Sequence, residues 1–199
     1  MGLTDDTYLT IEAPSEGIFK DNGSKFLAFA YPVSSEIEVK SYLDILKKEH
    51  HSARHCCWAY RLGKDGEIWR ANDDGEPSNS AGKPILGQIQ SNGLSNVAII
   101  VVRYFGGTLL GISGLIQAYK EAAANALFNA NVIQVMVESE HYILFPFDAM
   151  NKVMKVLKDK SAKIVSQTYE NECNIAFRIR KMDEQIILEA LLKIEGVKL

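Results

Sequence analysis

The most constraining stretch of this 199-residue chain is Asn96–Ala130, in which a buried-strand pattern passes through a glycine-rich corner into a long helix pattern. Val97–Val102 is a continuous apolar run of mostly β-branched residues, which is typical of a strand buried on both faces. After the corner, apolar residues recur at helical spacing. Free backbone N–H groups and positive potential collect at the start of such a helix, so the corner is a candidate ligand site.

The corner also has the glycine spacing of a nucleotide-binding P-loop, with Gly106 and Gly111 between a strand and a helix. However, Ile112 stands where a P-loop lysine would reach the β and γ phosphates. This missing charge argues against an NTPase. Two interpretations stay open: tight turning with Ser113 as a helix cap, or anion contact through backbone N–H groups with Arg103 as counter-charge.

Composition indicates a folded protein without an obvious polyanion partner, because hydrophobic residues make up 47% and the formal net charge is −3. No apolar run approaches the ~18 residues of a membrane span, and the N-terminus lacks the pattern of a signal peptide. We therefore expect a cytoplasmic protein with no membrane partner. Cys56, Cys57 and Cys173 lack CxxC spacing, which predicts no disulfide framework.

The first part of the chain predicts alternating strands and helices. We expect an antiparallel hairpin, a helix, a second hairpin, a polar loop, a short helix and, after the long helix, a strand that leaves the domain. These elements are expected at Tyr8–Phe19 with Lys25–Val33, Glu36–Glu49, Cys56–Leu62 with Ile68–Ala71, Asn72–Lys83, Pro84–Gln90 and Val132–Tyr142.

From His141 the pattern restarts with the element order β-α-β-β-α-β, which is that of a ferredoxin-like sandwich. The chain is thus predicted to be an α+β protein with domains at residues 1–138 and 139–199. After a strand from His141, the expected elements are a helix at Asp148–Asp159, strands at Ala162–Thr168 and Asn174–Ile179, a helix at Glu184–Leu192 and a short strand at Val197–Leu199.

The polar loop holds three carboxylates, Asp73, Asp74 and Glu76, within four positions. Such a group can bind magnesium or supply a general acid and base, which leaves a metal-dependent hydrolase as an alternative function. The structural interpretation is favoured, because Asp-Gly and Glu-Pro are turn dipeptides and Ser78 or Ser80 could cap the following helix.

Histidines and cysteines cluster just before the second hairpin. His51 and His55 stand four apart, a zinc spacing on a helix, but the accompanying glutamate of that motif is absent. We expect no metal here. Cys56 and Cys57 are expected to be one core side chain and one partly exposed side chain, because neighbours on a strand face apart.

Aromatic and arginine residues on the strands allow a nucleic-acid interpretation. A stacking platform for RNA needs exposed aromatic rings beside cations, whereas aromatic residues on strands more often belong to a core. The residues concerned are Trp58, Tyr60, Trp69, Tyr104 and Phe105, with Arg61, Arg70 and Arg103.

Three segments in this order resemble the YigZ and IMPACT family: HCCWAYRLG at His55–Gly63, DDGEPSNSAGKPIL at Asp73–Leu86 and RYFGGTLLGISGLIQAYKEAA at Arg103–Ala123. The resemblance covers essentially the whole chain, in the bacterial two-domain form. In the usual pattern DGEPSGTAG, a Gly-Thr pair stands where this chain has Asn79 and Ser80. The third segment, usually RYFGG-x-x-LG-x-GGL, here has Ile112 and Ser113.

The resemblance implies a first domain folded like the second domain of a ribosomal small-subunit protein, and a second domain similar to a ferredoxin-like module of elongation factor G. It also implies a role near translation. IMPACT-type proteins compete for the activator of a starvation-sensing kinase, a partner that bacteria lack, so that partner is not carried over to this bacterial-looking chain. The peptidase label sometimes given to the family finds no catalytic triad or metal set in these residues.

The function predicted is a non-catalytic regulator associated with translation, with RNA, the ribosome or a protein as partner and with no cofactor, metal or catalytic residue. A pure protein–protein module, docking through Phe105 and the polar loop, is a further alternative. The motif residues expected to line one surface of the first domain are His55, Trp58, Asp74, Gly75, Glu76, Pro77, Ser78, Gly82, Arg103, Tyr104, Phe105, Gly106 and Gly107.

Overall fold

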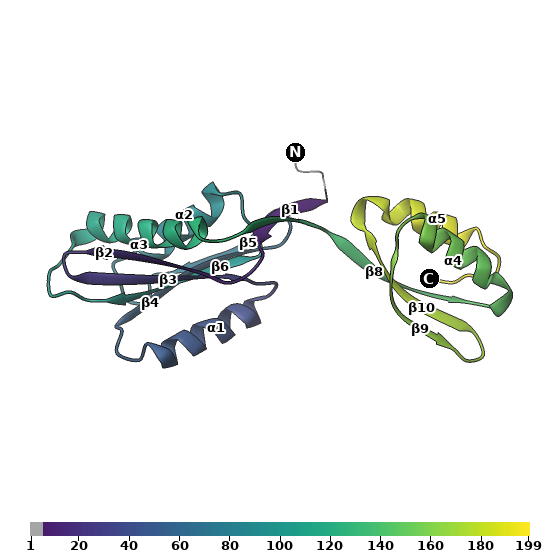
Figure 1. The fold of residues 1–199 in the computed structure, drawn as a ribbon, viewed down its shortest axis with the longest axis horizontal. Coiled ribbons are helices and arrows are strands. Elements are labelled where there is room, and N and C mark those ends of the chain that lie inside the picture. Colours follow the sequence, from purple (N-terminus) through teal and green to yellow (C-terminus); the bar gives the residue numbers. More distant parts are fainter. Residues whose placement is uncertain (1–5) are drawn as a thin grey trace. The chain divides into compact units, whose positions relative to one another are not determined.

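The structure, a computed structural model, describes residues 6–199, and these form two compact mixed α/β units (Figure 1). The larger unit is Tyr8–Val135. The smaller unit holds Met136–Leu199 together with Asp6 and Thr7. Within each unit the main sheet is antiparallel, as expected for an α+β protein.

The main sheet of the larger unit has five strands in the order β2-β3-β6-β4-β5. Its central strand, β6, begins at Val97 as predicted but continues two residues past Val102 to Tyr104. Strand β6 pairs with β3 on one side and with β4 on the other. The bounds of the other strands are β2 (Ser15–Asp21), β3 (Ser24–Pro32), β4 (His55–Leu62) and β5 (Ile68–Asn72).

Helices cover both faces of this sheet, which is why its central strand is apolar from Val97 to Val102 (Figure 1). Helices α2 (Gly82–Ser91) and α3 (Gly111–Phe128) lie on one face. Helix α1 (Glu36–Glu49) lies on the other, and its predicted bounds are confirmed. The Ser35 side chain caps α1 by accepting a hydrogen bond from the Glu38 N–H at 3.3 Å.

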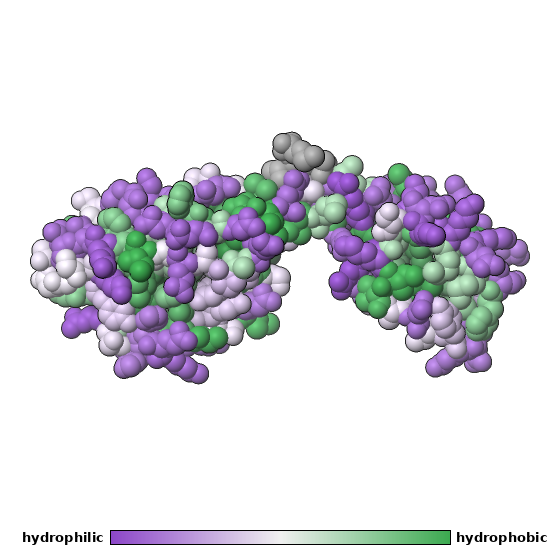
Figure 2. Space-filling view, in the orientation of Figure 1, coloured by the Kyte–Doolittle hydropathy of each residue, from purple (hydrophilic) through white to green (hydrophobic). Residues whose placement is uncertain are grey.

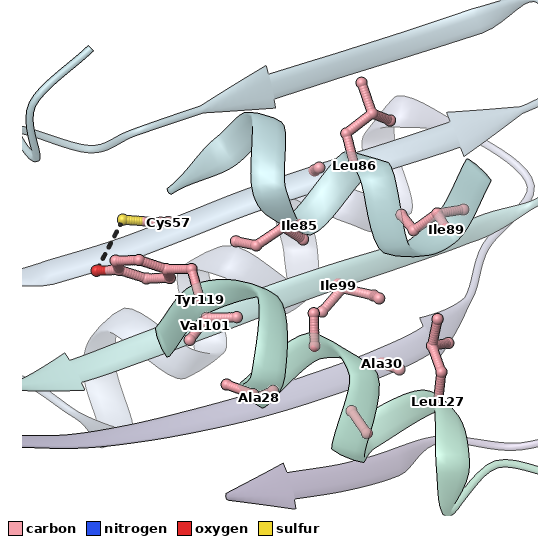
Figure 3. Close-up of a cluster of buried hydrophobic side chains, with 14 of the residues drawn as sticks. Ala28, Ala30, Cys57, Ile85, Leu86, Ile89, Ile99, Val101, Tyr119 and Leu127 are labelled. Carbon is pink, nitrogen blue, oxygen red and sulfur yellow. Dashed lines mark hydrogen bonds between the residues drawn. The ribbon is translucent and has the colours of Figure 1, made fainter. Parts of the chain in front are cut away.

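The main core lies between the sheet and helices α2 and α3 (Figure 3). Side chains of α2 and α3 meet Ala28 and Ala30 of β3 and the branched Ile99 and Val101 of β6 there. The Tyr119 ring reaches toward Cys57 on β4. Cys56 faces the other way but is buried too, because α1 covers that face. The prediction that one of the two cysteines would be partly exposed is therefore wrong.

Two predicted strands are each divided in the structure. The run Tyr8–Phe19 forms β1 (Thr7–Ile11) and β2, separated at Pro14, whose ring fixes φ and removes the backbone donor. Strand β1 pairs with β7 (Val132–Met136) in a separate two-stranded sheet. The predicted strand Val132–Tyr142 breaks at Val137, whose N–H donates to the Asp6 carbonyl.

The smaller unit has the predicted order of strands and helices, with a sheet ordered β8-β10-β9. The helix expected from Asp148 begins at Met150 after a 3₁₀ turn at Phe147–Ala149, and a second 3₁₀ turn spans Lys181–Asp183. The predicted last strand is reduced to one bridge between Lys198 and Leu144. The bounds are β8 (Glu138–Phe145), α4 (Met150–Asp159), β9 (Lys163–Tyr169), β10 (Cys173–Arg180) and α5 (Glu184–Leu192).

The surface is mostly hydrophilic on the face shown in Figure 2, with hydrophobic side chains gathered in patches on each unit. Among the helices of residues 6–199, none has the length and apolar character that crossing a membrane requires.

Candidate functional site

Strand register gathers the site at one end of the main sheet. Arg103 near the end of β6 lies directly opposite Phe26 on β3 and His55 on β4. Directly opposed residues of an antiparallel pair share a face of the sheet, here the face covered by α2 and α3. The polar loop between β5 and α2 reaches the same face, because Glu76 contacts Arg103.

Arg103 and Glu76 form a buried ion pair with 2.6 Å between Nη1 and Oε1, and their side chains are 7% and 3% exposed. The Tyr119 hydroxyl on α3 donates to the same carboxylate oxygen at 2.8 Å. The guanidinium also lies 5.5 Å from the ring centre of Phe26 and 5.6 Å from that of Phe105. Such a pair is costly to break, because either partner alone would leave an uncompensated buried charge.

Neutral groups extend this network into the core. The Cys57 Sγ lies 3.3 Å from the Tyr119 hydroxyl oxygen and 3.0 Å from the Asp73 carbonyl oxygen. Burial raises the pKa of the Cys57 thiol and of the Tyr119 hydroxyl well above their ordinary values, so both stay protonated at neutral pH. Burial also raises the pKa of Cys56 to about 11. A thiolate nucleophile on β4 is disfavoured by these shifts.

The Asp73 side chain caps helix α2, although Asp73 lies well before the start of that helix in the sequence. Its Oδ1 accepts hydrogen bonds from the N–H groups of Ala81 at 3.0 Å and Gly82 at 2.8 Å, and its Oδ2 accepts from Asn79 N–H at 2.8 Å. The prediction that Ser78 or Ser80 would cap this helix is wrong, since the Ser80 hydroxyl donates instead to the Pro77 carbonyl at 2.7 Å. The Asp73 carboxylate thus holds the polar loop against the start of α2.

Asp74 ties the loop to the opposite side of the sheet. Its Oδ2 accepts from the Cys56 N–H at 2.8 Å, and its Oδ1 pairs with the Lys47 ammonium at 3.1 Å. Its carbonyl lies 2.9 Å from Nδ1 of His55. Asp73, Asp74 and Glu76 therefore serve three separate sets of partners. Within residues 6–199, no group of three or more His, Cys, Asp and Glu side chains is arranged to hold a metal ion.

A pocket of about 440 Å³ opens beside the ion pair, and most of its wall is apolar. Leu109 and Ile112 stand at its side with 86% and 60% of their surface exposed, and Phe105 is half exposed. Surfaces that keep large aliphatic side chains in water commonly serve binding. The lining residues are Arg54, His55, Glu76, Pro77, Arg103, Phe105, Leu109, Leu110, Gly111, Ile112 and Leu115.

The sequence-based surface omitted Arg54 and the apolar wall of the pocket from Leu109 to Leu115. A signal was present, since the Leu109-Leu110 pair lies between glycines where a turn would normally be polar. Helix α3 begins at Gly111 without a side-chain cap, so the expected role of Ser113 as a cap is wrong. The anion interpretation also loses its cation, because Arg103 is paired with Glu76.

The structure separates two predicted surface residues from the others. Trp58 and Tyr104 point to the α1 face of the sheet, because side chains alternate along a strand. There the Trp58 ring stacks on Tyr60 at 5.7 Å between centroids, and the Tyr104 hydroxyl lies 2.8 Å from Nδ1 of His50. The aromatic residues considered for RNA stacking consequently do not form one platform with Phe105.

The motif glycines act through backbone approach. A Cβ on Gly106 would lie 1.9 Å from the carbonyl carbon of Gly23, so the corner packs directly on the β2–β3 turn. A Cβ on Gly82 would lie 2.6 Å from the backbone nitrogen of Asn72. Asn79 adopts φ +64°, a left-handed conformation that asparagine tolerates, which accounts for its standing at a position where the family pattern has glycine. The other predicted loop residues, Gly75, Ser78 and Gly107, are exposed.

Comparison with known proteins matches residues 22–127, more than half of the chain, to the family model described as Impact N-terminal domain. The IMPACT family member YvyE of Bacillus subtilis is 37% identical over 128 residues, which cover 64% of this chain and 59% of that protein. The IMPACT family member YigZ of Escherichia coli is 28% identical over 167 residues, covering 83% and 82%. A crystal structure of a hypothetical protein, 26% identical, superposes with a TM-score of 0.74 over 96% of this chain and 92% of its own.

Proposed function

Because the chain belongs to the IMPACT family, as the motifs indicated, we propose that it is a non-catalytic regulator associated with translation, which binds a protein component of the translation machinery through the pocket beside Arg103. The observation that carries the choice of a protein partner is the wall of that pocket. Leu109 and Ile112 are largely exposed there although they are aliphatic. Burying such side chains against a partner contributes about 1.5–3 kcal/mol each.

A protein ligand fits this pocket better than RNA does. Arg103 is neutralised by Glu76, which leaves Arg54 as the exposed cation among the lining residues. Phe105 and the His55 imidazole are the aromatic rings of the lining, since Trp58 and Tyr104 lie on the other face of the sheet. RNA surfaces combine several cations with stacked aromatic rings. An apolar anchor side chain in a preformed pocket is instead the usual centre of a protein interface.

The buried Arg103–Glu76 pair at the base of the pocket supports recognition because it holds the surrounding wall in a fixed position. Glu76 accepts from both Arg103 and Tyr119, so its carboxylate is held rigidly between β6 and α3. The hydrolase alternative would need carboxylates free to meet a metal or a water, whereas those of the polar loop hold backbone N–H groups and cations. The same residues are better suited to positioning the pocket wall than to chemistry.

The proposal extends to the expected likenesses and location. We place the protein in the cytoplasm, with its domains at residues 1–138 and 139–199. We relate the first to the second domain of a ribosomal small-subunit protein and the second to a ferredoxin-like module of elongation factor G. The element order of the smaller unit supports the ferredoxin-like assignment.

The test is affinity capture from a lysate of the source cells, with and without nuclease, followed by mass spectrometry. Exposed residues are the right ones to change, because replacing Arg103 would disturb the fold. We expect the wild-type chain to retain a ribosomal protein or translation factor after nuclease treatment, and Leu109→Asp with Ile112→Asp to lose it. The matched control is Phe128→Asp, which changes an 88% exposed side chain at the end of α3 that lies farthest from the pocket.

Capture that disappears on nuclease treatment would assign the interaction to RNA and contradict the choice of partner. If Phe128→Asp lost the partner to the same extent, binding would depend on exposed apolar side chains along α3 in general and not on the pocket. Retention of the partner by the Leu109 and Ile112 variant would remove the pocket from the interface.

A further inference from the structure

The smaller unit carries a concentration of positive charge that the proposed function leaves unused. Five lysines and a single aspartate, Asp159, are the charged residues of the segment 150–163. Lys163 pairs with Glu138 at 2.5 Å. The other four are exposed and form no ion pair within the part of the chain that the structure describes, and they are Lys152, Lys155, Lys158 and Lys160. The net charge of the whole chain is negative, so this positive charge is local.

A groove of about 600 Å³ lies between helix α4 and strand β9, beside these lysines. Its apolar part is formed by Met154, Leu157, Ala162 and Ile164. Lys155 and Lys158 stand in its wall, together with Asn151 and Asp159. The groove therefore offers aliphatic contact next to two ammonium groups.

Strand β9 is an edge strand with an uncovered side. Within residues 6–199 it pairs with β10 and with no second strand, and all seven of its residues are exposed. Its register with β10 shifts at Val165, after which Ser166–Tyr169 pairs regularly. The outer edge of that regular segment presents backbone N–H and C=O groups that a further strand could use. Figure 1 shows β9 at the border of its sheet, next to β10.

We propose that the edge of β9 and the groove beside α4 bind an extended, acidic peptide segment of a partner protein, which adds to the sheet as a strand. Backbone hydrogen bonds to β9 would supply the general affinity, as in other cases of strand addition. Alternate side chains of an extended peptide point to one side, so the residues at every second position face the groove. Some of these are aliphatic and enter it, and others are carboxylates that meet Lys155 and Lys158, which sets the preference for an acidic sequence.

Charge complementarity alone would also fit RNA, but the groove does not. Its lining has lysine point charges and aliphatic side chains, and it contains neither an aromatic ring nor an arginine. Single-stranded RNA is held mainly by base stacking on such flat groups. This groove shares no lining residue with the pocket beside Arg103. A negative result for the peptide would therefore leave the proposed function untouched, and the reverse also holds.

The test is fluorescence anisotropy of the full chain with a labelled peptide of about eight residues in which Glu and Val take turns at every second position and Ser occupies the positions between them. We expect saturable binding that weakens at least about tenfold in Lys155→Glu with Lys158→Glu, and that weakens as NaCl rises from about 50 mM to about 500 mM. Matched peptides with Gln in place of Glu, or Ser in place of Val, should each bind more weakly. Lys193→Glu, an exposed lysine at the end of α5, should leave binding within about twofold.

Backbone amide NMR shifts then locate the peptide, and we expect the largest changes in Ser166–Tyr169. Three results would overturn the proposal: no binding of the Glu-Val peptide at about 1 mM, equal weakening by Lys193→Glu, or tighter binding of a labelled oligouridine that Lys155→Glu with Lys158→Glu abolishes. The last would assign the lysines to RNA. Thermal melts of each variant check that these surface changes leave the fold intact.

Discussion

Glu76 and Arg103, 27 positions apart in the sequence, form an ion pair with 2.6 Å between their charged atoms and almost no exposure to water. We expect Arg103→Ala to lower the free energy of unfolding by about 3–5 kcal/mol, because the Glu76 carboxylate would stay buried without its cation. Urea denaturation measures this. Arg70→Ala removes an exposed pair with Glu36 and should cost less than about 1 kcal/mol, and equal losses in the two variants would contradict the result.

The Tyr119 hydroxyl is a second support of the same carboxylate. Tyr119→Phe removes one hydrogen bond to a charged acceptor, so a loss of about 1.5–3 kcal/mol in the free energy of unfolding is expected. Tyr104→Phe removes a hydroxyl contact with His50 on the other face and should cost about 0.5–1.5 kcal/mol. If both changes cost the same, the charge on Glu76 adds nothing to its bond with Tyr119.

Two glycines should respond to alanine in opposite directions. Gly106→Ala would place a Cβ against the backbone of Gly23, which requires both turns to shift and should cost about 1–3 kcal/mol. Gly87 lies inside α2 with open space around it, so Gly87→Ala should stabilise the protein by about 0.5–1 kcal/mol. Thermal unfolding of the two variants compares them directly, and a lower melting temperature for Gly87→Ala would refute the account of α2.

Because Asp73 acts as a cap of α2, replacing it should lower the free energy of unfolding and should have no other effect. Asp73→Ala leaves the first N–H groups of α2 without an acceptor and should cost about 1–2 kcal/mol. Asp73→Asn keeps one acceptor oxygen and should recover part of that loss. Asp65→Ala, at a largely exposed carboxylate, is the control and should change stability by less than about 0.5 kcal/mol.

Cys56 predicts a pH dependence of both reactivity and stability. Its pKa is about 11 in the folded chain against the ordinary 9.0, so at pH 8 its thiolate population is about one hundredth of that of a free thiol. Alkylation by iodoacetamide should therefore become fast only on unfolding. Between pH 9 and 11 the unfolded chain gives up this proton first, so the contribution of Cys56 to stability is complete below pH 9 and is lost as pH rises toward 11. A melting temperature that rises over this range in wild type relative to Cys56→Ala would contradict the sign.

The sequence predicted what depends on local pattern. The apolar run of β6, the bounds of α1 and the element order of the smaller unit all follow from periodicity and turn residues. The three motifs placed the chain in its family, which the family model confirms. A break such as the one at Pro14 was also readable, but strand pairing with the distant β7 was not, since pairing partners are set by tertiary contacts.

The candidate site was harder to predict, because register and burial decide it. Adjacent carboxylates suggested shared chemistry, yet Asp73 turns toward α2 and Asp74 toward β4. The sequence pattern ended β6 at Val102, two residues early. It therefore did not predict that Arg103 faces α2 and α3 while Tyr104 faces α1. The apolar wall at Leu109 and Ile112 could be recognised as a surface only once both side chains were seen in water.

Arg103 and Tyr104 are neighbours in the chain, but the sheet of β6 stands between their side chains. Their partners are not shared: Arg103 contacts Glu76 and two phenylalanine rings, and Tyr104 contacts His50. In a double-mutant cycle these two adjacent positions should consequently behave as distant sites, with a coupling energy below about 0.5 kcal/mol. The Arg103-Tyr104 pair of this chain thus makes two separate sets of contacts, one on each face of the sheet, and a substitution at either position should leave the partners of the other in place.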